Sequence, residues 1–227
     1  MRKWVSVCRA PGCGGFARRL AGMLVALVLL ASGAASAGEP IDLAGSAWAR
    51  AARPHGIDPA LLYALTLVES RRALGGHRVA PWPWVIHTPT GGYWFNSYAS
   101  ARRGLKAVLR KWPAKRVDVG AAQINVGWQR ARFGDPAELL DLDRNLQVAA
   151  AILAGTIAST PDPVIGIGRY HHWASDARSR AYGQRVWWAY REVTFGESQN
   201  RYVLGPPAAA PGSHAAVLAR SDDGGRD

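Results

Sequence analysis

The strongest constraint on the fold is a helix-start signal that is followed by an apolar stripe. In the sequence Gly-Ile-Asp-Pro at residues 56–59, Asp58 can accept hydrogen bonds from free backbone N–H groups, and Pro59 suits a first helical position that needs no donor. Apolar residues then recur at helical spacing, at Leu61, Leu62, Leu65 and Val68. We therefore expect a helix that begins at Pro59 and frays near residues 75–76, where two glycines stand together.

Glu69 falls on the apolar side of this predicted helix. It follows Leu65 by four residues and Leu62 by seven, so the three side chains share one face. A carboxylate that faces a core is costly to ionise, and this desolvation raises its pKa. Glu69 is therefore a candidate general acid near neutral pH. The alternative is a helix-end glutamate that reaches solvent or pairs with Arg71 or Arg72, and spacing alone leaves both interpretations open.

The first 37 residues have the order of a secretory signal. Basic residues come first, an apolar run follows over residues 20–31, and the small residues Ala35, Ser36 and Ala37 close the segment. The apolar run is short for a membrane span, which needs roughly 20 residues. We expect cleavage after Ala37 and a periplasmic mature protein, with retention as an uncleaved anchor as the alternative.

Composition limits the partners of the mature chain. The formal charge is +12, and the predicted signal carries five basic residues and no acidic ones, so the mature charge would be +7. This excess suggests a nucleic acid, a membrane surface or an anionic wall polymer as neighbour. No zinc-finger or basic-zipper pattern is present, and export argues against nucleic acid. Both cysteines, Cys8 and Cys13, leave with the signal, so we expect no disulfide and no cysteine metal site.

The chain divides into three parts on these grounds. We expect a signal peptide at residues 1–37, one domain at 38–200 and a disordered tail at 201–227. Proline, alanine, glycine, serine and charged residues dominate the tail from residue 205 onward.

Caps and periodicity predict the other elements of the domain. A short helix is expected over residues 41–53 with Asp42 as its cap, and a small hairpin where residues 79–87 and 93–95 flank a turn at 88–92. The remaining helical segments are residues 97–112 (capped by Asn96 or Ser97), 145–159 (begun by Asp141 or Asp143), 178–195 and a loop or short helix at 166–173.

The helix predicted at residues 97–112 is crowded with cations. An apolar stripe runs along it, and the other positions carry Arg102, Arg103, Lys106, Arg110 and Lys111. The simpler interpretation is a solvated helix face, and the alternative is attraction to an anionic polymer.

Residues that could assist Glu69 are few. Glycosidases commonly use two carboxylates, and the nearest conspicuous second acid is Asp118, whose simpler role is to hold the turn at Gly120 through backbone N–H groups. Gly120 suits a close backbone approach, and Gln123 and Asn125 offer amide donors and acceptors. The adjacent histidines at residues 171–172 lack a third ligand, so we expect neither a metal nor a cofactor.

Several motifs occur in an order that resembles bacterial lytic transglycosylases. They are Val68-Glu69-Ser70, Gly120-Ala-Ala-Gln123-Ile-Asn125, Asn145 at the head of an alanine-rich helix, Arg169-Tyr170-His171, and Tyr182 with Val186. The resemblance is to the soluble-lytic-transglycosylase-like domain and covers about residues 43–195. It looks closest to the small single-domain members associated with conjugation and with type IV or type III secretion systems.

The resemblance implies an α+β, predominantly helical, lysozyme-like fold with the hairpin as a lip of a sugar-binding groove. Glu69 would protonate the glycosidic oxygen between N-acetylmuramic acid and N-acetylglucosamine. The same carboxylate would then deprotonate the muramic C6 hydroxyl, which closes a 1,6-anhydro ring without a second acid. Ser70 would lie near the acid, Gln123 and Asn125 would hold substrate groups, and Tyr170 would hydrogen-bond near Glu69 and keep it protonated. The implied partners are peptidoglycan strands and components of a secretion or conjugation machine, for a chain expected to be monomeric.

The sequence also departs from the family pattern. Ala121 and Ala122 stand where bulkier residues, often Leu-Met, are common, which would leave the cleft wall emptier. His171 replaces the Asn of a Tyr-Asn pair, and the usual Gly shortly after that pair is missing. Two alternatives stay open: a hydrolytic muramidase in which Asp118 or another acid positions water, and a wall-binding or assembly module without activity.

Overall fold

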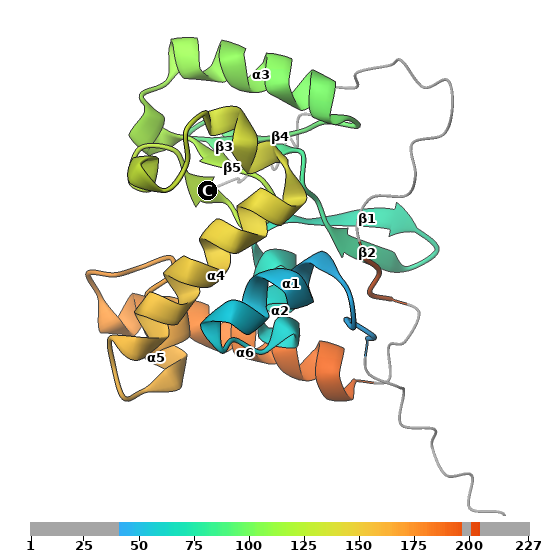
Figure 1. Ribbon diagram of the computed structural model, residues 1–227, viewed down its shortest axis with the longest axis vertical. Helices are drawn as coiled ribbons and strands as arrows, with labels where there is room; N and C mark the ends of the chain where they lie inside the picture. Colours follow the sequence, from blue (N-terminus) through green and yellow to red (C-terminus); the bar gives the residue numbers. More distant parts are fainter. Residues whose placement is uncertain (1–40, 197–200, 205–227) are drawn as a thin grey trace, which may run out of the picture. The chain divides into compact units, whose positions relative to one another are not determined.

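The computed structural model describes residues 41–196 and 201–204 (Figure 1). It combines helices with small antiparallel sheets, so the expected α+β class is confirmed. The α-helices are α1 (Ala47–Ala52), α2 (Pro59–Ser70), α3 (Tyr98–Lys111), α4 (Leu142–Ala158), α5 (Pro163–Gly168) and α6 (Asp176–Phe195). The strands are β1 (Arg71–Gly75), β2 (Arg78–Pro81), β3 (Val85–Thr88), β4 (Gly91–Trp94), β5 (Asp118–Val119) and β6 (Ile124–Asn125). The short 3-10 helices are η1 (Arg53–His55), η2 (Ala114–Arg116), η3 (Arg130–Arg132) and η4 (Pro136–Leu140).

Some expectations lie outside this part of the chain. The predicted signal at residues 1–37 falls outside it entirely, as do residues 205–227 of the predicted tail. Residues 201–204, which were expected to be disordered, are described, and Tyr202 forms a β-bridge with Val79 of β2. Within the part that the structure describes, no helix has the length and apolar character that a bilayer crossing would require.

Helix α2 lies in the middle of the hydrophobic core and contacts α1, α4 and α6. It begins as expected: Asp58 Oδ1 accepts the Ala60 N–H at 2.9 Å, and Pro59 occupies the first turn. Leu62 and Leu65 are fully buried, so the predicted apolar face is confirmed.

The predicted end of α2 is wrong, because the helix stops at Ser70 rather than near residues 75–76. The Ser70 hydroxyl accepts the Trp82 backbone N–H at 3.2 Å, which ties the helix end to the chain beyond β2. Residues 71–75 form β1 and pair with β2. Gly76 and His77 form the turn between these strands, and Gly75, Gly76 and His77 all have positive φ. Glycine adopts this conformation without a steric penalty, so the turn replaces the expected fraying.

The four-stranded sheet has the order β4-β3-β5-β6. Its β3–β4 hairpin confirms the turn expected at residues 88–92, although residues 79–81 pair with β1 instead of joining this hairpin. β3 also pairs with β5, and in that register His87 lies opposite Asp118. The sheet therefore places a histidine and a carboxylate on neighbouring strands.

The other helices start at polar caps. Ser97 caps α3 and Asp141 caps α4, so one of the two expected candidates is confirmed at each helix. The expected Asp42 cap of α1 is wrong: α1 begins only at Ala47 and Ser46 caps it, whereas Asp42 accepts the Ala44 N–H in the turn before it. Figure 1 shows α4 running from the side of the sheet to the side of α5.

Buried Asn145 joins α4 to the turn at Gly120. Its Nδ2 donates to the carbonyls of Val119 and Leu139 at 2.9 Å each, and its Oδ1 accepts the Ala122 N–H at 2.8 Å. Gly120 has φ +86°, and a Cβ there would lie 2.2 Å from Asn145 Nδ2. The expected close backbone approach at Gly120 is therefore confirmed.

Candidate active site

A cavity of about 780 Å3 opens where α2, the four-stranded sheet, α4 and the segment after α5 meet. Its polar walls carry ionisable and amide side chains from separate parts of the sequence, namely Glu69, His87, Asp118, Gln123, Tyr170 and His171. Trp128 and Trp173 also line it and are 68% and 61% exposed. The size is in the range of ligand-binding pockets, and exposed indole faces are suited to stacking against a ligand.

Glu69 is the most perturbed carboxyl of the cavity. Burial raises its pKa to about 7, and the charge of Asp118 adds to this, whereas a hydrogen bond from Tyr182 and the charge of Arg185 lower it. The carboxyl is thus near the midpoint of its titration at neutral pH, as a general acid or base should be. No ion pair joins Glu69 to Arg71 or Arg72 among the described residues, so the ion-pair form of the helix-end alternative is not found there.

The hydrogen-bond partner of Glu69 is Tyr182 of α6, which donates its phenolic hydrogen to Glu69 Oε1. Tyr182 is 1% exposed, and burial together with the charge of Glu69 holds its pKa well above the usual value. It therefore remains a donor. The ring of His171 stacks on the ring of Tyr182 with centroids 4.9 Å apart, and this contact helps to hold the Tyr182 ring in place.

Tyr170, the residue expected to hydrogen-bond near Glu69, has another partner. Its hydroxyl donates to the Ala122 carbonyl at 2.8 Å, and Glu69 affects it only through charge. Tyr182 belongs to one of the motifs in the sequence, but this role was not expected for it. The sequence feature that could have predicted this role is the position of Tyr182 in the apolar row of α6. A tyrosine buried by such a row needs an acceptor for its phenolic hydroxyl.

Ser70 lies in the core and does not line the cavity. It is 2% exposed, and its hydroxyl donates to the Ala121 carbonyl at 2.6 Å. Ala121 and Ala122 are fully buried and are not among the residues that line the cavity. Ser70 instead fixes the end of α2, and with it the backbone next to Glu69.

Gln123 lines the cavity and has a buried side-chain acceptor that the described residues do not use. Its Nε2 donates to the Gly120 carbonyl at 2.7 Å, whereas its buried Oε1 has no hydrogen-bond partner within the described part of the chain. Gln123 also has φ +47°, which is uncommon for a residue other than glycine. A buried acceptor without a partner is costly, so a donor on a bound ligand would stabilise this site.

Asn125 has no free hydrogen-bonding group of this kind. Its Nδ2 donates to Asp118 Oδ1 at 2.8 Å and to the Lys115 carbonyl at 3.1 Å, and its Oδ1 accepts the backbone N–H groups of Gly127 and Trp128. Its amide therefore shapes the loop that presents Trp128. This differs from the expected role of holding substrate.

Asp118 lies on the cavity wall and interacts through charge with His87 and His171. Burial raises its pKa, and the Asn125 hydrogen bond and the nearby His87 and His171 lower it. Burial also lowers the pKa of both histidines, so neutral imidazoles are favoured. The expected backbone hydrogen bonds of Asp118 at the Gly120 turn are absent from the described structure; there, the Gly120 N–H donates to the Val85 carbonyl at 2.9 Å.

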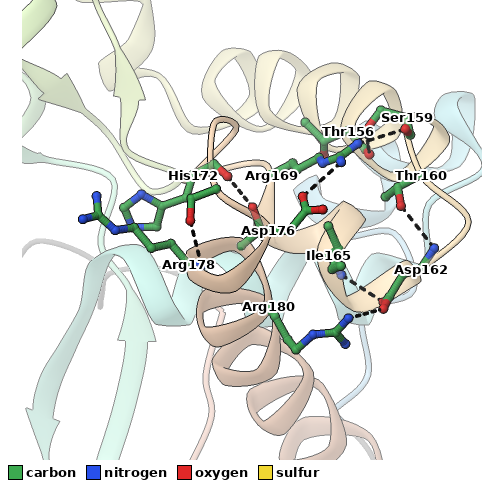
Figure 2. Close-up of polar contacts among 12 residues, drawn as sticks. Thr156, Ser159, Thr160, Asp162, Ile165, Arg169, His172, Asp176, Arg178 and Arg180 are labelled. Carbon is green, nitrogen blue, oxygen red and sulfur yellow. Dashed lines mark hydrogen bonds and ion pairs between the residues drawn. The ribbon is translucent and has the colours of Figure 1, made fainter.

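Figure 2 shows the polar network that holds the segment after α5 in place. The guanidinium of Arg169 donates to the Ser159 carbonyl at 2.9 Å and pairs with Asp176 at 3.1 Å. Arg180 pairs with Asp162, the cap of α5, at 2.8 Å. These contacts connect α4, α5 and α6, and so they fix the turn that carries Tyr170, His171 and Trp173. No group of three potential metal ligands occurs among the described residues.

Comparison of the chain with protein-family models, with curated proteins and with solved structures finds no match.

Proposed function

We propose that this protein is a peptidoglycan lytic transglycosylase with a lysozyme-like arrangement of its helices and hairpin. The observation that carries the proposal is the Glu69 carboxyl, which has a pKa of about 7 and lines a cavity with exposed indole faces. The order of the motifs around Glu69, Gln123 and Tyr182 supports the same assignment.

Protonated Glu69 would donate its hydrogen to the oxygen that bridges N-acetylmuramic acid and N-acetylglucosamine. The bond between this oxygen and the muramic C1 then breaks, and N-acetylglucosamine leaves with a free hydroxyl. The Glu69 carboxylate, stabilised by the hydrogen bond from Tyr182, takes the proton of the muramic C6 hydroxyl as O6 bonds to C1. The proton returns to Glu69 and no water is consumed, so one carboxyl with a pKa near neutrality can perform both transfers.

Other residues of the cavity would hold the glycan. Gln123 Oε1 can accept a hydrogen bond from an acetamido N–H or a hydroxyl of the sugar, which would satisfy this buried oxygen. Trp128 and Trp173 offer exposed ring faces for the apolar faces of the sugar rings. His87 of the β3–β4 hairpin lines the same cavity, which agrees with the hairpin acting as one lip of the groove.

The cellular setting follows from the sequence. The order of the first 37 residues supports export to the periplasm, where peptidoglycan is available. Local opening of the wall for a secretion or conjugation machine is the role that the family resemblance favours.

A hydrolytic muramidase is the second candidate because Asp118 provides another carboxylate on the same cavity wall. Its charge raises the pKa of Glu69, so the two groups interact. In this mechanism Asp118 would position a water molecule that attacks C1, and the product would carry a reducing end instead of an anhydro ring.

Muropeptide analysis after digestion of purified sacculi tests both candidates, with Glu69→Gln as the inactive control. Anhydro ends that disappear in the variant support the transglycosylase, whereas reducing ends support the hydrolase. If the wild-type protein binds sacculi and releases no products, the catalytic proposal is wrong and the chain is a wall-binding module.

A further inference from the structure

Positive charge is concentrated in one stretch of the described chain. Residues 98–132 hold nine lysines and arginines and only one acidic residue. The other described residues hold twelve cationic and ten acidic side chains, which nearly balance. The stretch contains α3, η2 and η3, so most of the unbalanced charge of the described residues lies on these three helices and the segments that join them.

A groove of about 720 Å3 runs between α3 and η4. Apolar groups, among them Leu105, Leu109 and Pro136, contribute to its lining. The cations that line it are Arg102, Arg103, Lys106 and Arg110 of α3, and all four are exposed. We call this feature the α3 groove. It combines an apolar lining with a row of positive charges.

The cations of the α3 groove lack partners in the described structure. The ion pairs there involve other arginines, on α1, α4 and α6 and just after α5. Asp135 is the one acid in the groove, and its carboxylate accepts the Ala137 N–H as the cap of η4. Arg102, Lys106 and Arg110 follow each other at four-residue spacing, so like charges repel along about 12 Å of one helix face. An anionic ligand would remove this repulsion.

The α3 groove adjoins the cavity of Glu69 along the chain. Trp128 and Arg132 line the cavity, and Asp135 and Pro136 line the groove. Arg132 and Asp135 are three residues apart, so the chain between them spans at most about 11 Å. This separation between the nearest lining residues is short enough for a side branch of a polymer in the cavity to span.

We infer that the α3 groove binds the carboxylate-bearing peptide stems of peptidoglycan. This inference rests on the proposed function, since it assumes that the cavity takes the glycan of the same polymer. A peptide stem offers carboxylates to the cations and alanine methyl groups to the apolar lining. The concave shape disfavours a flat membrane surface, which is bound by protruding apolar side chains.

The test is the affinity of the purified full chain for a fluorescent stem tetrapeptide, L-Ala–γ-D-Glu–diaminopimelate–D-Ala, measured by anisotropy. A groove variant combines Arg102→Gln, Lys106→Gln and Arg110→Gln. A control variant combines Arg53→Gln, Arg78→Gln and Arg178→Gln, which are exposed and lie outside the groove, so both variants lose three charges. We expect about tenfold weaker binding in the groove variant and a change below about twofold in the control. A stem with amidated carboxyl groups should bind wild type as weakly as the natural stem binds the groove variant.

Equal losses in the two variants would overturn the inference, because net charge alone would then explain binding. The inference would also be overturned if binding of phosphatidylglycerol vesicles or duplex DNA weakens in the groove variant while binding of the stem tetrapeptide does not. The tetrapeptide has no glycosidic bond, so its binding is independent of turnover at Glu69. If the wild type releases anhydro products and the groove variant binds the stem normally, only this inference is contradicted. If the protein binds stems through the groove but cleaves no glycan, only the proposed function is contradicted.

Discussion

The cavity at Glu69 holds its ionisable groups among buried partners, whereas the α3 groove leaves four cations exposed and without a partner among the described residues. In the cavity, burial raises the pKa of Glu69 and of Asp118 and lowers that of His87. In the groove, solvent keeps the charges available for attraction. Burial therefore produces groups that can exchange protons near neutral pH. Exposure leaves cations that can attract an anionic ligand but do not take part in proton transfer.

The largest expected effect in the cavity is the loss of activity in Glu69→Gln. The amide fills nearly the same volume but can neither give nor take the proton, and general acid–base catalysis contributes about 10²–10⁴-fold. Release of anhydro-muropeptides from sacculi should fall by at least that factor, while binding of the stem tetrapeptide at the α3 groove stays unchanged. Near-normal release of anhydro products from the variant would show that Glu69 is not the acid.

The same substitution should increase stability at higher pH. The pKa of Glu69 is about 7 in the folded protein against an ordinary value of 4.5, so the folded state binds more protons between these values. Wild-type stability should therefore fall as pH rises from about 4.5 to about 7 and then level off, by at most about 3 kcal/mol.

Glutamine does not ionise, so Glu69→Gln should exceed wild type in stability at about pH 8 and match it at about pH 4.5. Urea denaturation at both pH values measures the difference. The groove variant is the control: it keeps Glu69, so its stability should show the same pH dependence as wild type. A constant difference between Glu69→Gln and wild type at both pH values would contradict the raised pKa.

Two single substitutions should shift the activity profile in opposite directions. The hydrogen bond from Tyr182 lowers the pKa of Glu69, so Tyr182→Phe should raise this pKa and move the alkaline fall of kcat/KM to higher pH. The charge of Asp118 raises the same pKa, so Asp118→Asn should move that fall to lower pH. Residual products of Asp118→Asn should still carry anhydro ends if the transglycosylase proposal is correct. Shifts in the same direction would mean that the variants act through general damage to the cavity.

Caps, prolines and apolar periodicity predicted the parts of the fold that depend on residues close together in the sequence. The cap and proline at residues 58–59 gave the start of α2, and the periodicity around Glu69 gave its buried face. The end of α2 could not be read in the same way, because it depends on the Ser70 hydroxyl meeting the Trp82 backbone, a contact made only after folding.

The candidate site shows the same division. The position of Glu69 on an apolar face predicted the direction of its pKa shift, which depends mainly on burial. The partner was misassigned between two tyrosines because Tyr170 and Tyr182 both reach this region, and only the packing of α6 decides which hydroxyl meets the carboxyl. The sequence suggested that the Asn125 amide is available to a ligand. In the folded loop, its Nδ2 and Oδ1 each already make two hydrogen bonds within the protein.

The smallest expected effect separates the two regions by salt. Exposed charges are screened over about 10 Å at 0.1 M ionic strength and about 3 Å at 1 M, so binding of intact sacculi should weaken severalfold across this range. The groove variant should lose most of this salt dependence because it removes exposed cations of α3. Trp173→Ala should weaken binding at every salt concentration and keep the wild-type slope, since stacking on an indole ring is not screened. Sedimentation of sacculi at several salt concentrations measures both slopes. If the groove variant keeps the wild-type slope, the attraction arises from cations elsewhere, and the α3 cations form only a solvated helix face.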